Sequence, residues 1–194
     1  MSDALPCVKP ADLIDRLYAR QSVAHRVLLE HSRRVTRKAL GIGRFLVARG
    51  EAVDLQFLAE AAMLHDIGIG GTYAPDIGCT GDAPYLQHGI IGARILNDWG
   101  LPRHARVCER HTGVGLTADE ILRHQLPLPA RDMIPETLEE KIICYADLFY
   151  SKDPAKLSQE KNSDSIRRQL LKFGQDKVDV FTLWQQTFEP DTLT

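Results

Sequence analysis

Apolar residues recur every three to four positions along most of this chain, which is the spacing of an amphipathic α-helix. The longest such pattern follows Ser22 and ends near Gly50, a residue type that suits a helix C-terminus. Its apolar stripe contains Val27, Leu28, His31, Val35, Ala39, Ile42 and Leu46. A shorter helix is expected at 11–20, and Asp54 is suited to cap a third. This part of the chain is therefore predicted to be helical.

The rest of the chain shows the same period. A helix is expected to start near His88, and Gly100 and Pro102 separate it from the next one, which carries His111. Further helices are predicted after the capping pairs Thr117/Glu120 and Thr137/Glu140, around 160–173 and at 176–188. No run of residues alternates between apolar and polar as a half-buried strand would. The sequence thus predicts an all-α fold, a single compact helical bundle over residues 1–194.

Residues 68–84 interrupt this pattern, because glycine and proline recur throughout them. They are predicted to form a loop, and a loop of this length inside a compact domain is often functional. We expect the segment 70–84 to cover a substrate as a lid. Tyr73 would then be available to stack on a base.

Composition indicates an ordinary globular protein: 44% of the 194 residues are hydrophobic, 26% are charged and the net charge is −2. This charge gives no electrostatic case for a nucleic acid or a membrane as the main partner, although a local cluster could still bind one. No apolar run approaches the roughly 20 residues that span a bilayer. The first residues lack the pattern of a signal peptide, and the four cysteines form no CxxC pair. A cytoplasmic location is expected.

Six ionisable side chains fall on or beside the stripes that should face the core: His31, His65, Asp66, His88, His111 and Asp147. A single histidine on an apolar helix face is usually a hydrogen-bonded core residue. Several imidazoles and two carboxylates buried together make physical sense if they converge on cations, which replace their lost hydration. Imidazole and carboxylate ligands without thiolate suit iron, manganese, zinc, nickel or cobalt.

The motifs around these residues are "HSRRVTRKA" from His31, "LHDIG" containing His65 and Asp66, "HGIIGARIL", "HTGVG" and "YAD". In this order they resemble the HD superfamily of metal-dependent phosphohydrolases, specifically its HDIG-type members with two metals. The resemblance covers about residues 22–150, the HD core, preceded by the helix at 11–20. The extension at 151–194 matches no catalytic motif and is expected to serve packing or an oligomer surface.

The resemblance implies two divalent ions, with iron or manganese favoured and cobalt, nickel or zinc as alternatives. His31, His65, Asp66 and Asp147 would hold one ion, and Asp66 would bridge to a second ion held by His88 and His111. Two cations roughly 3.5–4 Å apart can share a water, lower its pKa and align it for in-line attack on phosphorus. Asp66 and His65 are thereby implied to be the catalytic residues.

Contacts to a substrate are predicted less directly. Arg34 lies one turn from His31, Arg110 precedes His111, and Lys141 and Lys152 flank Asp147. Each could bind phosphate oxygens, yet arginine and lysine on a helix are usually solvated. Many relatives carry a lysine directly after HDIG, where this chain has Ile69. If that lysine contacts the substrate in relatives, this chain must use another cation.

The sequence therefore indicates a metal-dependent phosphohydrolase of the phosphatase, phosphodiesterase or dinucleoside polyphosphatase type. Its substrate is expected to be a nucleotide or another small phosphorylated metabolite. Two alternatives use the same ligands: a di-iron HD-type oxygenase, and a nonenzymatic regulator that binds metal and nucleotide. No membrane partner is expected and nucleic acid is disfavoured, whereas homo-oligomerisation is left open.

Overall fold

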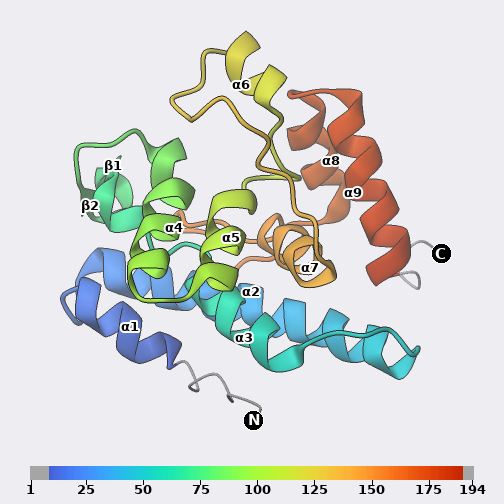
Figure 1. Cartoon of the computed structure of the whole chain (residues 1–194), viewed down its shortest axis with the longest axis horizontal. Helices are drawn as coiled ribbons and strands as arrows, with labels where there is room; N and C mark the ends of the chain where they lie inside the picture. The colour runs from blue at the N-terminus through green and yellow to red at the C-terminus, as the bar shows by residue number, and fades with distance from the viewer. Residues whose placement is uncertain (1–8, 190–194) are drawn as a thin grey trace.

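The computed structural model describes residues 9–189, which form a bundle of α-helices with one small sheet at its edge (Figure 1). The helices are α1 (Pro10–Leu17), α2 (Val23–Ala48), α3 (Leu55–Leu64), α4 (His88–Asp98), α5 (Pro102–Arg110), α6 (Ala118–Arg123), α7 (Leu138–Asp147), α8 (Ser163–Leu171) and α9 (Gln175–Phe188). The predicted all-α class is confirmed. No helix within the described residues is both long and apolar enough to cross a lipid bilayer.

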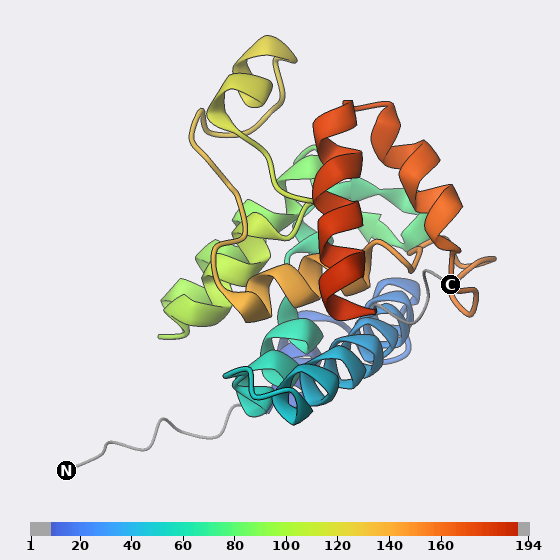
Figure 2. The ribbon, with the colours of Figure 1, turned by 90° about the vertical axis from the view of Figure 1, so that its right-hand side faces the viewer.

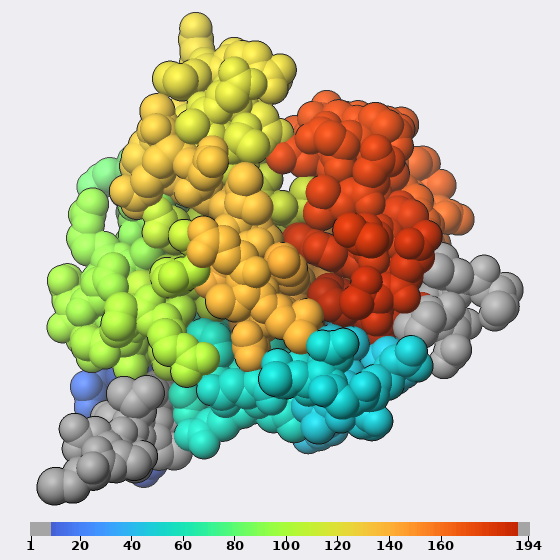
Figure 3. Space-filling model, turned by 45° about the vertical axis from the view of Figure 1, so that its right-hand side comes forward, coloured from blue at the N-terminus to red at the C-terminus, as the bar shows by residue number. Residues whose placement is uncertain are grey.

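The long helix α2 organises the bundle. Ser22 caps it by accepting a hydrogen bond from the backbone N–H of His25, as its residue type favours. The predicted stripe from Val27 to Leu46 is buried. It packs against α3 and α7, while α4 packs against α5 (Figure 1). α7 (orange) lies between α5 (green) and α9 (red) in Figure 3.

The extension after 150 also belongs to the packed core. α8 and α9 pair with each other, and α9 contacts α7 and α2 (Figure 2). Phe181 of α9 is fully buried and stacks on Tyr145 of α7, with 5.3 Å between the ring centroids. The part of this extension that the structure describes therefore contributes to the core, and a role as an oligomer surface stays a prediction.

The predicted loop at 68–84 is more ordered than expected. It contains the 3₁₀ turns η1 (Ile69–Gly71), η2 (Pro75–Ile77) and, directly after it, η3 (Tyr85–Gln87). The expectation of no strand was wrong here, because β1 (Tyr73–Ala74) pairs antiparallel with β2 (Cys79–Thr80). Two-residue strands are too short to produce an alternating pattern, so the sequence gives no signal for them.

Two apolar clusters make up the core, and several helices contribute residues to both of them. On α2, Leu28 belongs to one cluster and Val35 to the other, with His31 between them. At the end of α3, immediately before His65, Ala62 belongs to the same cluster as Val35, and Leu64 belongs to the same cluster as Leu28. The predicted histidines therefore lie where the two clusters meet.

A close backbone approach fixes the turn after α3. A Cβ atom on Gly68 would lie 2.2 Å from the carbonyl oxygen of His88 and 2.3 Å from the nitrogen of Gly92. The hydroxyl of Tyr18, the residue directly after α1, donates to the carbonyl of Ile67 (2.6 Å) and accepts from the N–H of Gly70 (2.8 Å). These contacts hold the segment that carries His65 and Asp66 against α4 and α1.

Candidate metal centre

The structure brings together all six residues predicted as ligands. His31 lies within α2, whereas the others lie at helix ends: His65 and Asp66 after α3, His88 at the start of α4, His111 after α5 and Asp147 at the end of α7. The four histidines and Asp66 are buried, and the side chain of Asp147 is 16% exposed. Three helix C-termini, those of α3, α5 and α7, thus carry their partial negative charge to one place, where a cation is favoured.

One group consists of His31, His65, Asp66 and Asp147. The Nε2 atom of His31 lies 3.1 Å from Asp66 Oδ2, 2.9 Å from Asp147 Oδ1 and 3.3 Å from Nε2 of His65. Nε2 of His65 lies 3.1 Å from the same Asp66 oxygen and 3.5 Å from Asp147 Oδ1. Four potential ligand atoms therefore surround one point.

The second group consists of Asp66, His88 and His111. The other oxygen of Asp66, Oδ1, lies 3.3 Å from Nε2 of His88 and 3.3 Å from Nε2 of His111. The two Nε2 atoms are 3.0 Å apart. Asp66 is shared by both groups, and each of its oxygens faces a different pair of histidines.

Hydrogen bonds orient three of the rings. Nδ1 of His65, His88 and His111 each lies 2.7 Å from a backbone carbonyl, of Ala62, Tyr85 and Cys108 respectively. A carbonyl can only accept, so each Nδ1 carries a proton and donates it. In the neutral ring the Nε2 lone pair then points into the cluster, which is the usual arrangement of a metal-bound histidine.

These distances fit a metal site. Two ligand atoms about 2.1 Å from a common ion are about 3.0 Å apart at a right angle and about 3.4 Å apart at the tetrahedral angle. Nitrogen lone pairs of His88 and His111 that face each other at 3.0 Å would repel unless a proton or a metal lay between them. Oδ1 of Asp66 and Oδ1 of Asp147 are buried without a well-aligned hydrogen-bond donor among the described residues, and Oδ2 of Asp66 has the ammonium group of Lys152 2.7 Å away. A cation would satisfy all of these atoms at once.

The charges of the cluster support the same interpretation. Burial lowers the pKa of His88 to about 3, so this ring is neutral and free to bind metal. Burial would also lower the pKa of His65, but the carboxylates of Asp66 and Asp147 raise it to about 10. Burial would raise the pKa of Asp66, yet the charges of Lys152 and His65 hold it well below its usual range. Without a metal, a proton and an ammonium group balance the carboxylates.

Lys152 is the residue that sequence reasoning underrated. It lies in the irregular segment after α7, and its Nζ atom is 2.7 Å from Asp66 Oδ2. Only 15% of its side chain is exposed. Helical periodicity could not reveal this contact, because the segment is not helical. The one signal was indirect: Ile69, fully buried, stands where many HDIG relatives have a lysine.

The residues predicted to bind substrate lie outside the six-residue cluster. Arg34 pairs with Glu30 (2.7 Å) and donates to the carbonyl of Ser158 (3.2 Å). Arg110 pairs with Glu136 (2.8 Å). Lys141 makes no side-chain hydrogen bond or ion pair with any described residue, and Tyr73 is 66% exposed. The structure therefore brings none of these four to the metal ligands, and their contact with substrate stays a prediction.

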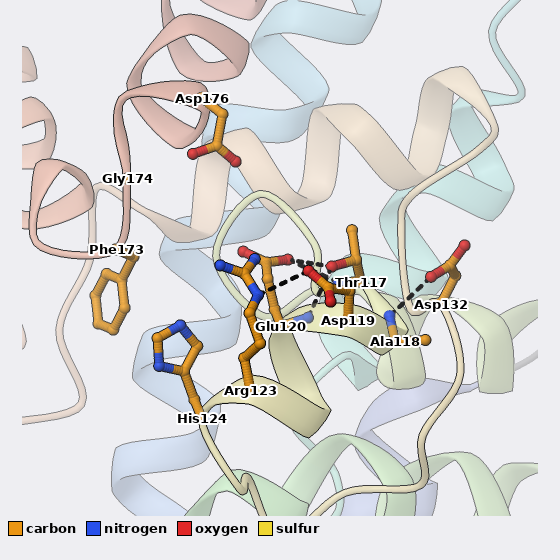
Figure 4. A pocket seen from close by; sticks show the side chains of 10 residues that line it. All are labelled: Thr117, Ala118, Asp119, Glu120, Arg123, His124, Asp132, Phe173, Gly174 and Asp176. Atoms are coloured by element: carbon orange, nitrogen blue, oxygen red, sulfur yellow. Dashed lines mark hydrogen bonds and ion pairs between the residues drawn. The ribbon is translucent and has the colours of Figure 1, made fainter.

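A surface cleft of about 720 Å³ lies elsewhere, between α6 and the turn that joins α8 to α9 (Figure 4). His124 and Phe173 face each other across it, and Asp119 pairs with Arg123 (Figure 4). Four carboxylates line it, those of Asp119, Glu120, Asp132 and Asp176. Two of these carboxylates are paired, Asp119 with Arg123 and Glu120 with Lys177, and none of the six cluster residues reaches the cleft. We therefore locate the chemistry at the buried cluster.

The fold and the buried His/Asp cluster define a metal-binding helical domain, and comparison with known families identifies it. The family model described as "HD domain" matches residues 28–151, close to the predicted core at 22–150. The chain belongs to the HD family, whose members bind divalent metals and carry out hydrolase-type chemistry.

Several known sequences are similar to this chain, including the following three. The uncharacterized protein MJ0778 of Methanocaldococcus jannaschii is 33% identical over 155 residues, which cover 74% of this chain and 84% of that protein. A tRNA (cytidine(56)-2'-O)-methyltransferase of Picrophilus torridus is 41% identical over 101 residues, 52% of this chain and 26% of the relative. The enzyme of the same name from Thermoplasma volcanium is 27% identical over 152 residues, 78% of this chain and 39% of the relative. This chain thus spans well under half of either methyltransferase, and no solved structure matches it significantly.

Proposed function

We propose that this protein is a metal-dependent phosphohydrolase that acts on a small phosphorylated metabolite such as a nucleotide. One observation carries the proposal: Asp66 directs its two oxygens to two separate pairs of histidines, at 3.1 Å and 3.3 Å. A carboxylate between two ligand groups is suited to bridge two cations. Paired cations are typical of enzymes that hydrolyse phosphate esters by in-line displacement.

The protein's own residues then have definite tasks. When bound, the two cations supply an activated water and neutralise charge on the phosphoryl oxygens. His65 and Asp66 would hold the cations: the hydrogen bond to Ala62 orients the ring of His65, and the close approach of Gly68 to α4 fixes the backbone that follows Asp66. In the reaction, a water oxygen bonds to phosphorus, the bond from phosphorus to the leaving oxygen breaks, and a water proton passes to the leaving oxygen.

The cysteines near the cluster, among the residues that the structure describes, are poor nucleophiles. Cys108 lies nearest in sequence to His111, but burial raises the pKa of its thiol well above the usual range. It donates a hydrogen bond to the carbonyl of Leu64 instead. Burial likewise raises the pKa of the Cys144 thiol. Because a neutral thiol is a poor nucleophile, attack by water is the chemistry that the residues support.

The experiment is a screen of the purified protein loaded separately with manganese, iron, cobalt or nickel. Phosphate monoesters, diesters and dinucleoside polyphosphates are the substrates, and release of phosphate or nucleotide is measured. Hydrolysis with at least one metal supports the proposal. Consumption of oxygen by the iron form without hydrolysis would favour the oxygenase instead, and metal binding without any turnover would favour a regulator.

Asp66→Ala should abolish this hydrolysis and sharply reduce metal content, because both groups lose a ligand. Asp98→Ala is the matched control, since Asp98 is exposed, lies outside the predicted lid at 70–84 and forms no ion pair with a described residue. Elemental analysis and rate should remain at wild-type values in the control. Full metal content and a near-normal rate in Asp66→Ala would contradict the assignment.

A further inference from the structure

Lys152 is placed unlike any other lysine among the described residues. Its ammonium group reaches the shared ligand Asp66 from the segment after α7, with 2.7 Å between Nζ and Oδ2. Its charge also acts on Asp147, whose pKa it helps to hold well below the usual range although burial would raise it. A lysine this deeply buried usually has a charged partner or a function. Here it faces the metal ligands directly.

Tyr85 stands beside it, at the start of η3. A hydrogen bond and the charge of Lys152 act on the Tyr85 hydroxyl, whose pKa burial nevertheless raises to about 12. The ring of Tyr85 stacks on His88, with 4.9 Å between the centroids and 25° between the planes. Tyr85 is 37% exposed, so this residue reaches from the buried His88 to solvent. Lys152 and Tyr85 together form a polar corner next to both ligand groups.

Once metal is bound, the contact with Asp66 can no longer balance the charge of Lys152 by itself. An ion held by His31 and His65 would coordinate the same Asp66 oxygen that Lys152 contacts. Lys152 would then lose negative charge from its neighbour and face a positive ion. Two divalent cations carry four positive charges against the two negative charges of Asp66 and Asp147. A buried ammonium in such surroundings requires an anion.

We propose that Lys152 and the Tyr85 hydroxyl form a binding subsite for phosphoryl oxygens of the substrate that the metals do not hold. This inference rests on the proposed function and narrows it, because the excess positive charge favours a terminal phosphate with two negative charges over a diester with one. Many HDIG relatives have a lysine at the position of Ile69. In this chain, Lys152 would provide that positive charge instead. The other cations named from the sequence are less suited, since Arg34 and Arg110 already pair with Glu30 and Glu136.

The test measures binding of inorganic phosphate to the Mn²⁺-loaded protein by calorimetry, which needs no turnover. Lys152→Met removes the charge at similar length, and Lys152→Arg retains it. Lys156→Met is the matched control, because Lys156 lies in the same segment but its side chain is 64% exposed. Mn²⁺ affinity without phosphate is measured for every variant, and circular dichroism verifies that each is folded.

Lys152→Met should weaken phosphate binding roughly 10- to 100-fold, the range for loss of one hydrogen bond to a charged group. Its Mn²⁺ affinity should be unchanged or higher, because the ammonium no longer competes for Asp66. Lys152→Arg should keep most of the phosphate affinity, Tyr85→Phe should lose a smaller factor, and the control should match the wild type.

Two results would overturn the subsite. Phosphate affinity in Lys152→Met equal to that of the wild type would show that the lysine does not bind the anion. Loss of Mn²⁺ binding in the same variant would show that it serves only to position Asp66. Failure of the proposed function looks different: the wild type would bind Mn²⁺ and phosphate, with the expected Lys152 dependence, yet hydrolyse no ester.

Discussion

At the scale of residues, the protonation of His65 distinguishes the metal-free cluster from an occupied one. The pKa of His65 is about 10, because the charges of Asp66 and Asp147 outweigh the effect of burial. At neutral pH the ring therefore carries a proton on Nε2, the atom that would bind metal. His88 differs, since burial lowers its pKa to about 3 and leaves its Nε2 free. Metal binding thus has to displace a proton from His65 and none from His88.

This difference predicts how metal affinity depends on pH. A proton released on binding makes the affinity rise as pH increases, up to the pKa of the group that releases it. We expect the affinity of the first group to increase with pH until about 10, the pKa of His65. Calorimetry in two buffers of different ionisation enthalpy counts the protons released. No proton release near neutral pH would contradict the charge state assigned to His65.

At the scale of elements, the turn after α3 decides whether the ligands meet. A side chain on Gly68 would collide with the backbone of His88 and Gly92 at 2.2–2.3 Å. Gly68→Ala should therefore lower the free energy of unfolding by about 3 kcal/mol or more, as overpacking against backbone does. Metal content should fall as well, because α4 carries His88. Chemical denaturation and elemental analysis measure the two effects.

Gly41→Ala provides the control within α2. A Cβ atom at Gly41 meets nothing within 4 Å, and the residue lies in the helix interior. Alanine there should stabilise the protein by about 0.5–1 kcal/mol. Equal effects of the two substitutions would show that the turn is not tightly packed against α4.

Of the features of this protein, its helices are the ones that the sequence predicts best. Helical spacing placed His31 among the buried residues of α2, and the Thr137/Glu140 pair marked the start of α7. The spacing works because α2 buries one face along its whole length. It could not find Lys152, which lies in an irregular segment and reaches the cluster only through the tertiary fold. It also could not show that Arg110 pairs with Glu136, which lies far away in the sequence, whereas the Glu30/Arg34 pair has the i,i+4 spacing that a helix brings together.

At the scale of the whole molecule, the C-terminal helices close the core over α7. Phe181 is fully buried against Tyr145 and Phe149. Phe181→Ala should lower the free energy of unfolding by about 3–5 kcal/mol, the usual cost of removing a buried phenylalanine. Leu183→Ala, on the same helix but 61% exposed, should change it by less than about 0.5 kcal/mol. Equal stability of the two variants in denaturant titrations would mean that α9 does not complete the core.

The central claim is that the cluster holds two cations bridged by Asp66, and metal stoichiometry tests it most directly. The measurement is elemental analysis of the purified wild type and of the double variant His88→Ala/His111→Ala, after saturation with manganese. The wild type should hold two ions per chain. The double variant should remain folded and hold one, bound by His31, His65, Asp66 and Asp147. One ion in both proteins would contradict the account, because His88 and His111 would then bind no metal.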